Sequence, residues 1–221
     1  TRDEDTIHKA GDGRTSMRGR MGSPNSAMET LASQICTQIT TVFTSAAAAE
    51  PGGPSLLDLV VDEIAAVAGR KGRIFVYGVG REGLMLRALC MRLAHLGLPA
   101  HCLLHVTTPP IAAVDLLLAS AGPGGFSTVD ALCAAARSHG ARVLLLTACP
   151  DTGSCVRHAT ALGYLPARTM ADDGGGAPSL LPMGSLYEAA MFVLFEMVVF
   201  RLGDLLGETP EAVRSRHTNL E

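Results

Sequence analysis

Glu188 is the strongest candidate in the sequence for acid–base chemistry. It lies in Ser185-Leu186-Tyr187-Glu188, directly before a long apolar segment. A carboxylate held at the start of a buried helix can carry a proton. The same spacing is typical of a capping box, in which Ser185 is the N-cap and Glu188 bonds back to its amide. Spacing alone therefore leaves Glu188 open as a proton carrier or as a helix cap.

A first glycine-rich loop, Gly78-Val79-Gly80-Arg81-Glu82-Gly83, follows a short apolar run and opens a helical pattern. It fits the dinucleotide-binding fingerprint, which also expects an acidic residue about 20 positions later. Positions 84–114 contain no Asp or Glu. We therefore interpret Gly80, Arg81 and Glu82 as part of a phosphate or sugar cradle at a helix N-terminus. A tight turn that needs glycine only for its backbone angles is the alternative.

A second glycine-rich loop, positions 120–125, also lies between a predicted strand and a predicted helix, and Thr107-Thr108-Pro109-Pro110 follows another strand. Loops at the carboxyl ends of parallel strands share one rim of the sheet. Each loop alone is more often an ordinary turn, but together they favour a binding crevice. The further candidate binding residues are Thr107, Thr108, Ser120, Gly122, Gly124, Ser127 and Thr128.

The composition favours a small-molecule partner. The formal net charge is −3 and there is no block of Lys or Arg, which argues against a nucleic-acid partner. The six cysteines form no close metal-type pair, and the spacing of Cys149, Cys155 and His158 matches no standard metal site. We expect reduced thiols, no metal, a cytoplasmic location and no membrane span, because charged residues interrupt the longest apolar helix.

Apolar runs and helical periodicities alternate along most of the chain. Strands are expected at 73–77, 101–106, 115–119, 142–147 and 162–166, and helices at 28–50, 55–69, 80–95, 128–139, 153–161, 186–206 and from Thr209. Ser55 and Thr209 are candidate N-caps, and Pro210 is expected at the first position of the last helix. This alternation predicts a doubly wound, mostly parallel sheet with two N-terminal helices and a long C-terminal helix. We expect residues 1–27 to be a disordered tail, residues 28–221 to form a single domain, and Gly174-Gly175-Gly176 to lie in a flap.

Five segments together resemble the 6-phospho-3-hexuloisomerases, members of the sugar isomerase (SIS) family. They are Tyr77-Gly78-Val79-Gly80-Arg81-Glu82-Gly83, Met91 to Gly97, Thr107-Thr108-Pro109, Leu181 to Glu188, and the ending Arg216-His217-Thr218-Asn219-Leu220-Glu221. The resemblance covers the chain from about Met28 onward. Its Arg-His-x-Asn-Leu-Glu ending is specific, since other SIS domains lack it.

The resemblance implies a five-stranded parallel SIS sheet, a homotetramer, and an isomerase without a metal or organic cofactor. The implied partner is a sugar phosphate, and the implied reaction interconverts 3-hexulose 6-phosphate and fructose 6-phosphate through a cis-enediol. Glu188 matches the family's base. His217 matches a histidine with an acid or ring-handling role, which reaches the site from a neighbouring subunit.

The chain departs from the family in its two glycine-rich loops. Glu82 replaces the serine of Gly-x-Gly-Arg-Ser-Gly, and Ala121-Gly122-Pro123-Gly124-Gly125-Phe126 replaces Ser-Gly-Ser-Gly-Glu-Thr. Backbone amides, Arg81, Ser120, Ser127 and Thr128 are the groups left to bind a phosphate. A regulatory SIS module that binds a sugar derivative without converting it is therefore the alternative function.

Overall fold

The computed structural model describes residues 24–49, 54–172 and 179–220. The chain divides into two compact units, Thr1–Gln34 and Ile35–Glu221. The described part of the first unit is the beginning of helix α1 (Pro24–Ala49). Proline suits the first turn of a helix, and α1 starts at Pro24 rather than at the expected Met28. The rest of the expected tail, and the three glycines of the expected flap, lie outside the described residues.

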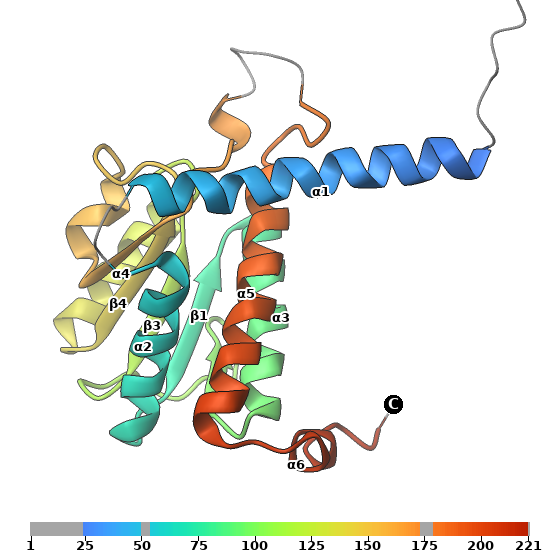
Figure 1. Cartoon of the computed structure of the whole chain (residues 1–221). Helices are drawn as coiled ribbons and strands as arrows, with labels where there is room; N and C mark the ends of the chain where they lie inside the picture. Colours follow the sequence, from blue (N-terminus) through green and yellow to red (C-terminus); the bar gives the residue numbers. More distant parts are fainter. Residues whose placement is uncertain (1–23, 50–53, 173–178, 221) are drawn as a thin grey trace, which may run out of the picture. The chain divides into compact units, whose positions relative to one another are not determined.

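The second unit is built on five parallel strands in the order β2-β1-β3-β4-β5, which confirms the predicted architecture (Figure 1). The strands are β1 (Ile74–Gly78), β2 (Ala100–Cys102), β3 (Leu116–Ser120), β4 (Arg142–Thr147) and β5 (Ala161–Tyr164). Every residue of β3 is buried, as is typical of a central parallel strand. The edge strand β2 is shorter than the predicted 101–106 because it pairs only with β1.

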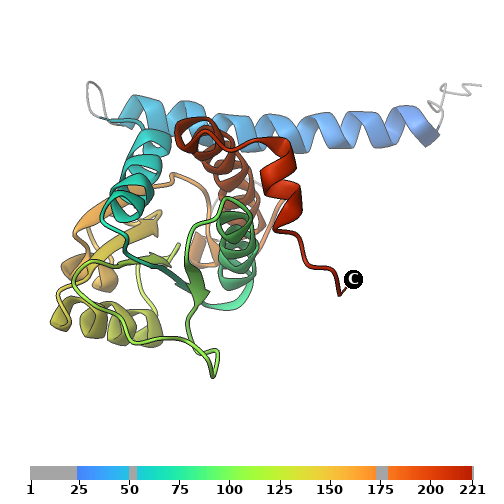
Figure 2. The same cartoon turned by 90° about the horizontal axis from the view of Figure 1, so that it is seen from below.

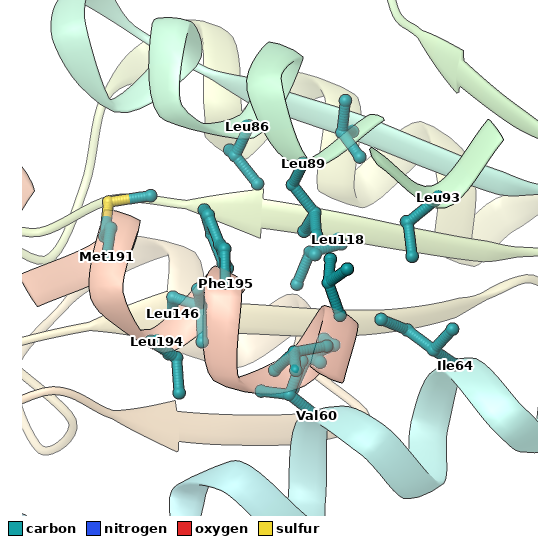
Figure 3. Close-up of a cluster of buried hydrophobic side chains, with 14 of the residues drawn as sticks. Val60, Ile64, Leu86, Leu89, Leu93, Leu118, Leu146, Met191, Leu194 and Phe195 are labelled. Carbon is teal, nitrogen blue, oxygen red and sulfur yellow. The ribbon is translucent and has the colours of Figure 1, made fainter. Parts of the chain in front are cut away.

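Helices cover both faces of the sheet. Helices α2 (Leu56–Gly69), α3 (Gly80–His95) and α5 (Ser185–Leu206) pack on one face, while α4 (Ser127–Ser138) packs on the other with the 3-10 turn η1 (Ser154–His158) (Figure 2). The helix expected over 153–161 is only this short turn, because β5 already begins at Ala161. Figure 3 shows side chains of α2, α3 and α5 converging on Leu118 and Leu146 of the sheet.

The helix ends show which capping predictions hold. Ser55 caps α2 by accepting a hydrogen bond from the Asp58 amide at 3.1 Å, as predicted. Thr209 likewise caps the short helix α6 (Pro210–Ser215), whose first residue is the expected proline. A further 3-10 turn, η2 (Met170–Asp172), precedes α5. No helix among the described residues has the length and apolarity needed to cross a membrane.

Helix α5 is apolar around most of its circumference, yet within this chain one of its sides is open. Phe192 is 49% exposed and Phe200 is 70% exposed. They line an apolar hollow of about 370 Å³ together with Met197 of α5 and Leu57 of α2. Apolar side chains of the long helix therefore face solvent in the isolated chain.

Candidate functional site

A cavity of about 370 Å³ lies where the first turns of α3 and α5 meet. It is partly enclosed, and its walls come from both helix starts, from Phe126 before α4, and from the segment that precedes α5. The lining residues are Val79, Gly80, Arg81, Glu82, Phe126, Thr169, Met170, Met183, Gly184, Tyr187 and Glu188. The structure thus brings Gly80, Arg81, Glu82 and Glu188 together, four of the residues proposed from the sequence.

The capping-box interpretation of Glu188 is wrong. Gly184, in the left-handed conformation with φ 79°, is the N-cap of α5, and Ser185 is the first helical residue. The amide of Glu188 donates to the Gly184 carbonyl at 3.1 Å, and no side chain caps this helix end within the described segment. A Cβ at position 184 would lie 3.3 Å from Oε1 of Glu188. The carboxyl group of Glu188 therefore lies beside the N-cap residue, and Glu188 also lines the cavity.

Arg81 is the cation that faces Glu188. Its Nη2 lies 3.0 Å from Oε2 of Glu188, its Nη1 donates to the Ser185 hydroxyl at 2.8 Å, and it also donates to the Met183 carbonyl. The Glu188 side chain is 15% exposed and the Arg81 side chain 48%. Oε2 of Glu188 accepts no hydrogen bond from the described residues, so the contact with Arg81 is an ion pair without hydrogen-bond geometry.

The environment of Glu188 holds the pKa of its carboxyl group above the usual value. Burial raises the pKa of Glu188, the Arg81 cation opposes this rise, and the neighbouring Glu82 adds to it. The net effect is an upward shift. A group with a raised pKa and access to a cavity has the properties of a general base.

Glu82 is held in the wall of the cavity by a buried hydrogen-bond network. The Ser120 hydroxyl donates to Oε2 of Glu82 at 2.5 Å, and the Gly122 amide donates to the same oxygen at 3.0 Å. The Tyr187 hydroxyl lies 3.3 Å from the Ser120 hydroxyl. Burial raises the pKa of Glu82, and the hydrogen bonds from Ser120 and Gly122 partly oppose it. The Ser120 and Gly122 donors proposed for substrate thus already have a partner within the protein.

Tyr187 is the member of this network that sequence reasoning missed. It is 1% exposed, and burial raises the pKa of its phenol well above the usual value. Tyr187 directly precedes Glu188 in the sequence, but a tyrosine on a buried helix is usually a core residue without a role in a site. Only the contact with Ser120, 67 positions away, reveals its place in the site.

The other candidate residues of the β3 loop lie beside the cavity rather than in its wall. Gly124 has φ 95° and packs so closely on Gly153 that a Cβ would lie 2.9 Å from that residue's Cα. Ser127 and Thr128 are exposed in the first turn of α4. None of the three lines the cavity of Glu188.

Thr107 and Thr108 lie in a different hollow. Together with Arg87, Cys90 and His101 they line a pocket of about 400 Å³ beside the edge strand β2. The Thr108 hydroxyl donates to the carbonyls of Cys102 and His105 at 2.9 and 2.7 Å. The structure therefore does not bring the two threonines to the cavity of Glu188 within one chain, since β2 lies on the far side of β1 from β3.

His217 also lies away from this cavity in its own chain. Its exposed ring stacks near His95, with ring centres 5.2 Å apart. His95 ends α3, whereas Arg81 lies in its first turn. A 16-residue helix is about 24 Å long, so His217 and Glu188 lie near opposite ends of α3. Contact between the two residues would need a second copy of the chain.

The cysteines and histidines leave no metal centre among the residues that the structure describes. No three His, Cys, Asp or Glu side chains there are grouped as metal ligands. All six cysteines are free thiols. Burial raises the pKa of Cys90 and of Cys133 to about 12, which makes them unreactive core residues.

Comparison with solved structures shows the fold. A hypothetical protein from Methanococcus jannaschii, for which the function of 3-hexulose-6-phosphate isomerase was inferred, matches with a TM-score of 0.71 at 23% identity, over 86% of this chain and 98% of that one. A putative sugar-phosphate isomerase from Listeria monocytogenes matches with a TM-score of 0.65 at 20% identity, over 89% of this chain and 99% of that one.

Comparison with curated proteins shows the family, although no family model matches the chain. The 3-hexulose-6-phosphate isomerase of Mycobacterium gastri is 38% identical over 180 residues, which cover 75% of this chain and 89% of the relative. The enzyme of the same name from Bacillus subtilis is 32% identical, over 67% of this chain and 80% of the relative. By this similarity and its five-stranded parallel fold, the chain is an isomerase that belongs to the 3-hexulose-6-phosphate isomerase family of SIS proteins.

Proposed function

We propose that this isomerase interconverts 3-hexulose 6-phosphate and fructose 6-phosphate, and that Glu188 is its base. The observation that carries the proposal is the Glu188 carboxyl group, which lines a cavity of about 370 Å³ and has no hydrogen bond from the described residues at Oε2. The names of its relatives supply the substrate. The catalytic unit is the single domain expected over residues 28–221.

The reaction needs one base that serves two neighbouring carbons. Glu188 takes the proton from C2 of the 3-ketose, and the electron pair left on carbon forms the 2,3-enediol as the C3 carbonyl oxygen gains a proton. The enediol then loses the proton on O2 and takes the carbon-bound proton at C3, which gives the 2-ketose. The atoms balance and no net oxidation occurs, so one carboxyl group can both remove and return the proton.

The charges around Glu188 suit this exchange. A base must be ionised to take a proton, yet a carboxylate that is too acidic takes it poorly. Burial and Glu82 raise the pKa of Glu188, while Arg81 at 3.0 Å keeps the ionised form accessible. Arg81 is also the one cation among the described residues of the cavity wall, so we propose that it contacts the substrate.

The proposal is tested by turnover of 3-hexulose 6-phosphate, coupled to detection of fructose 6-phosphate. We expect Glu188→Gln to lower kcat by about 10²–10⁴, the usual contribution of a positioned base. Glu211→Gln is the matched control, because Glu211 is an exposed carboxylate in the first turn of α6. Full activity of Glu188→Gln would refute the base. Thermal shifts with sugar phosphates that are never converted would instead favour the regulatory alternative.

We further propose a homotetramer in which His217 acts on the cavity of a neighbouring subunit. The exposed apolar side of α5, with Phe192 and Phe200, supports self-association. If the two residues of one site come from different chains, inactive Glu188→Gln and His217→Gln variants should complement each other when assembled together. With equal mixing, half of the sites have the right Glu188 and half of those the right His217, so about a quarter regain activity. No recovery in verified mixed oligomers would exclude the arrangement.

The cytoplasm is the proposed location. All six cysteines are free, and five of them, Cys90, Cys102, Cys133, Cys149 and Cys155, are buried or half-buried. Free thiols in this number are typical of a reducing compartment.

A further inference from the structure

The loop that follows β3 presents two donors of the kind that bind oxyanions. They are the hydroxyl of Ser120 and the backbone amide of Gly122, which we call the β3 loop donors. Both lie at the carboxyl end of a central parallel strand, where ligands of such sheets bind. Backbone amides and hydroxyls that converge in this way commonly bind phosphate and sulfate. We call the space in front of the β3 loop donors the oxyanion seat.

In this protein a side chain already occupies that seat. Glu82 accepts from the Ser120 hydroxyl at 2.5 Å and from the Gly122 amide at 3.0 and 3.2 Å. The fit is tight, because a Cβ at Gly122 would lie 3.1 Å from Oε1 of Glu82 and 3.0 Å from the Tyr187 ring. No volume remains between the carboxyl group and the loop for a second oxyanion.

The carboxyl group also closes the seat from the cavity. Ser120 is 0% exposed and Glu82 7%, and Glu82 lines the cavity while Ser120 and Gly122 do not. No ion pair of Glu82 occurs among the described residues, so a buried carboxylate relies on the β3 loop donors for its stabilisation. Donors that satisfy Glu82 are not available to a ligand.

We propose that Glu82 determines ligand specificity by acting as a built-in anion that fills the oxyanion seat of the β3 loop. A ligand in the Glu188 cavity then places an uncharged hydroxyl group, not its phosphate, against this wall. The phosphate of a sugar phosphate lies instead toward the half-exposed Arg81. This inference rests on the proposed function only in placing the ligand in that cavity.

The experiment measures sulfate binding, because sulfate does not titrate near neutral pH and needs no turnover. Wild type, Glu82→Ser, Glu82→Gln and the exposed control Glu211→Ser are compared by calorimetry. Glu82→Ser vacates the seat and should bind sulfate about 10-fold to 100-fold more tightly than wild type, the value of a charge-assisted hydrogen bond. Glu82→Gln keeps the seat filled and should resemble wild type, as should Glu211→Ser.

Two results would overturn the proposal. One is sulfate binding by wild type as tight as by Glu82→Ser, and the other is an equal gain in Glu82→Gln, which would show that charge alone matters. If Glu82→Ser does not fold, the wild-type protein alone still tests the proposal through the amide resonance of Gly122. The Gly122 amide resonance should stay unchanged as sulfate is added, and a saturable shift would refute the filled seat. An inactive enzyme would refute the proposed reaction but would leave each of these binding results valid.

Discussion

Replacing Arg81 by Gln tests the electrostatic account of Glu188. The Nη2 atom of Arg81 lies 3.0 Å from Oε2 of Glu188, and the Arg81 side chain is 48% exposed. Because water screens so exposed a charge, we use the dielectric constant of water for this pair. Coulomb's law then gives about 1.4 kcal/mol, which corresponds to about one pKa unit. Burial and Glu82 both raise the pKa of Glu188, and only Arg81 among the named causes lowers it. Without the cation, the pKa should therefore rise by about one unit.

The assay is the pH dependence of kcat/KM for isomerisation, which reports groups of the free enzyme. The base must be ionised, so activity is lost as the pH falls through the pKa of Glu188. In Arg81→Gln this acidic limb should move to higher pH by about one unit. Arg81→Lys keeps the charge and should leave the limb closer to its original position. A limb that stays in place in Arg81→Gln, or moves to lower pH, would refute the proposed balance of charges around Glu188.

Three further predictions concern the scaffold, measured as the free energy of unfolding in urea. Gly83→Ala should destabilise by about 1–3 kcal/mol, because the new Cβ would lie 2.4 Å from the Gly78 carbonyl oxygen; unchanged stability would contradict this close approach. Leu118→Ala, in the fully buried centre of the sheet, should cost about 2–5 kcal/mol, and a smaller loss would show that the cavity collapses. Burial disfavours the ionised Asp115, but hydrogen bonds from Arg73 and from the Ala112 amide outweigh it and hold the pKa of Asp115 below its usual range. Wild type should therefore keep this stabilisation above the ordinary pKa of aspartate and lose it as the pH falls toward the lowered one, whereas Asp115→Asn should lack that loss.

Patterns that depend on neighbours in the sequence were readable without the structure. The strand, glycine turn and helix predicted from Arg73 to His95 appear as β1 and α3, because a short apolar run bounded by glycine has few alternatives. The caps at Ser55 and Thr209 are local hydrogen bonds and were correct. The parallel sheet followed from the alternation of strands and helices.

Features that depend on distant contacts were not readable. Ser185 has the spacing of an N-cap, but Gly184 adopts the left-handed conformation and the Ser185 hydroxyl accepts from Arg81, 104 positions away. Thr107 was expected beside the other loops, yet it follows an edge strand and lines a separate hollow. The sequence shows Glu82 in place of the family's serine. It does not show that the partners of Glu82 are in the β3 loop, 38 and 40 positions away.

Helix α5 is needed to complete both the apolar core and the candidate site. Helix α5 supplies Met191, Leu194 and Phe195 to the apolar layer over Leu118, and its first turn carries Glu188 (Figure 3). Synthesis runs from the N-terminus, so the sheet and the helices α2 and α3 leave the ribosome before this cover exists. A chain that stops before Ser185 leaves exposed the apolar surface that α5 covers, which favours aggregation and proteolysis. The same truncation removes Glu188, so a chain without this cover also lacks the proposed base.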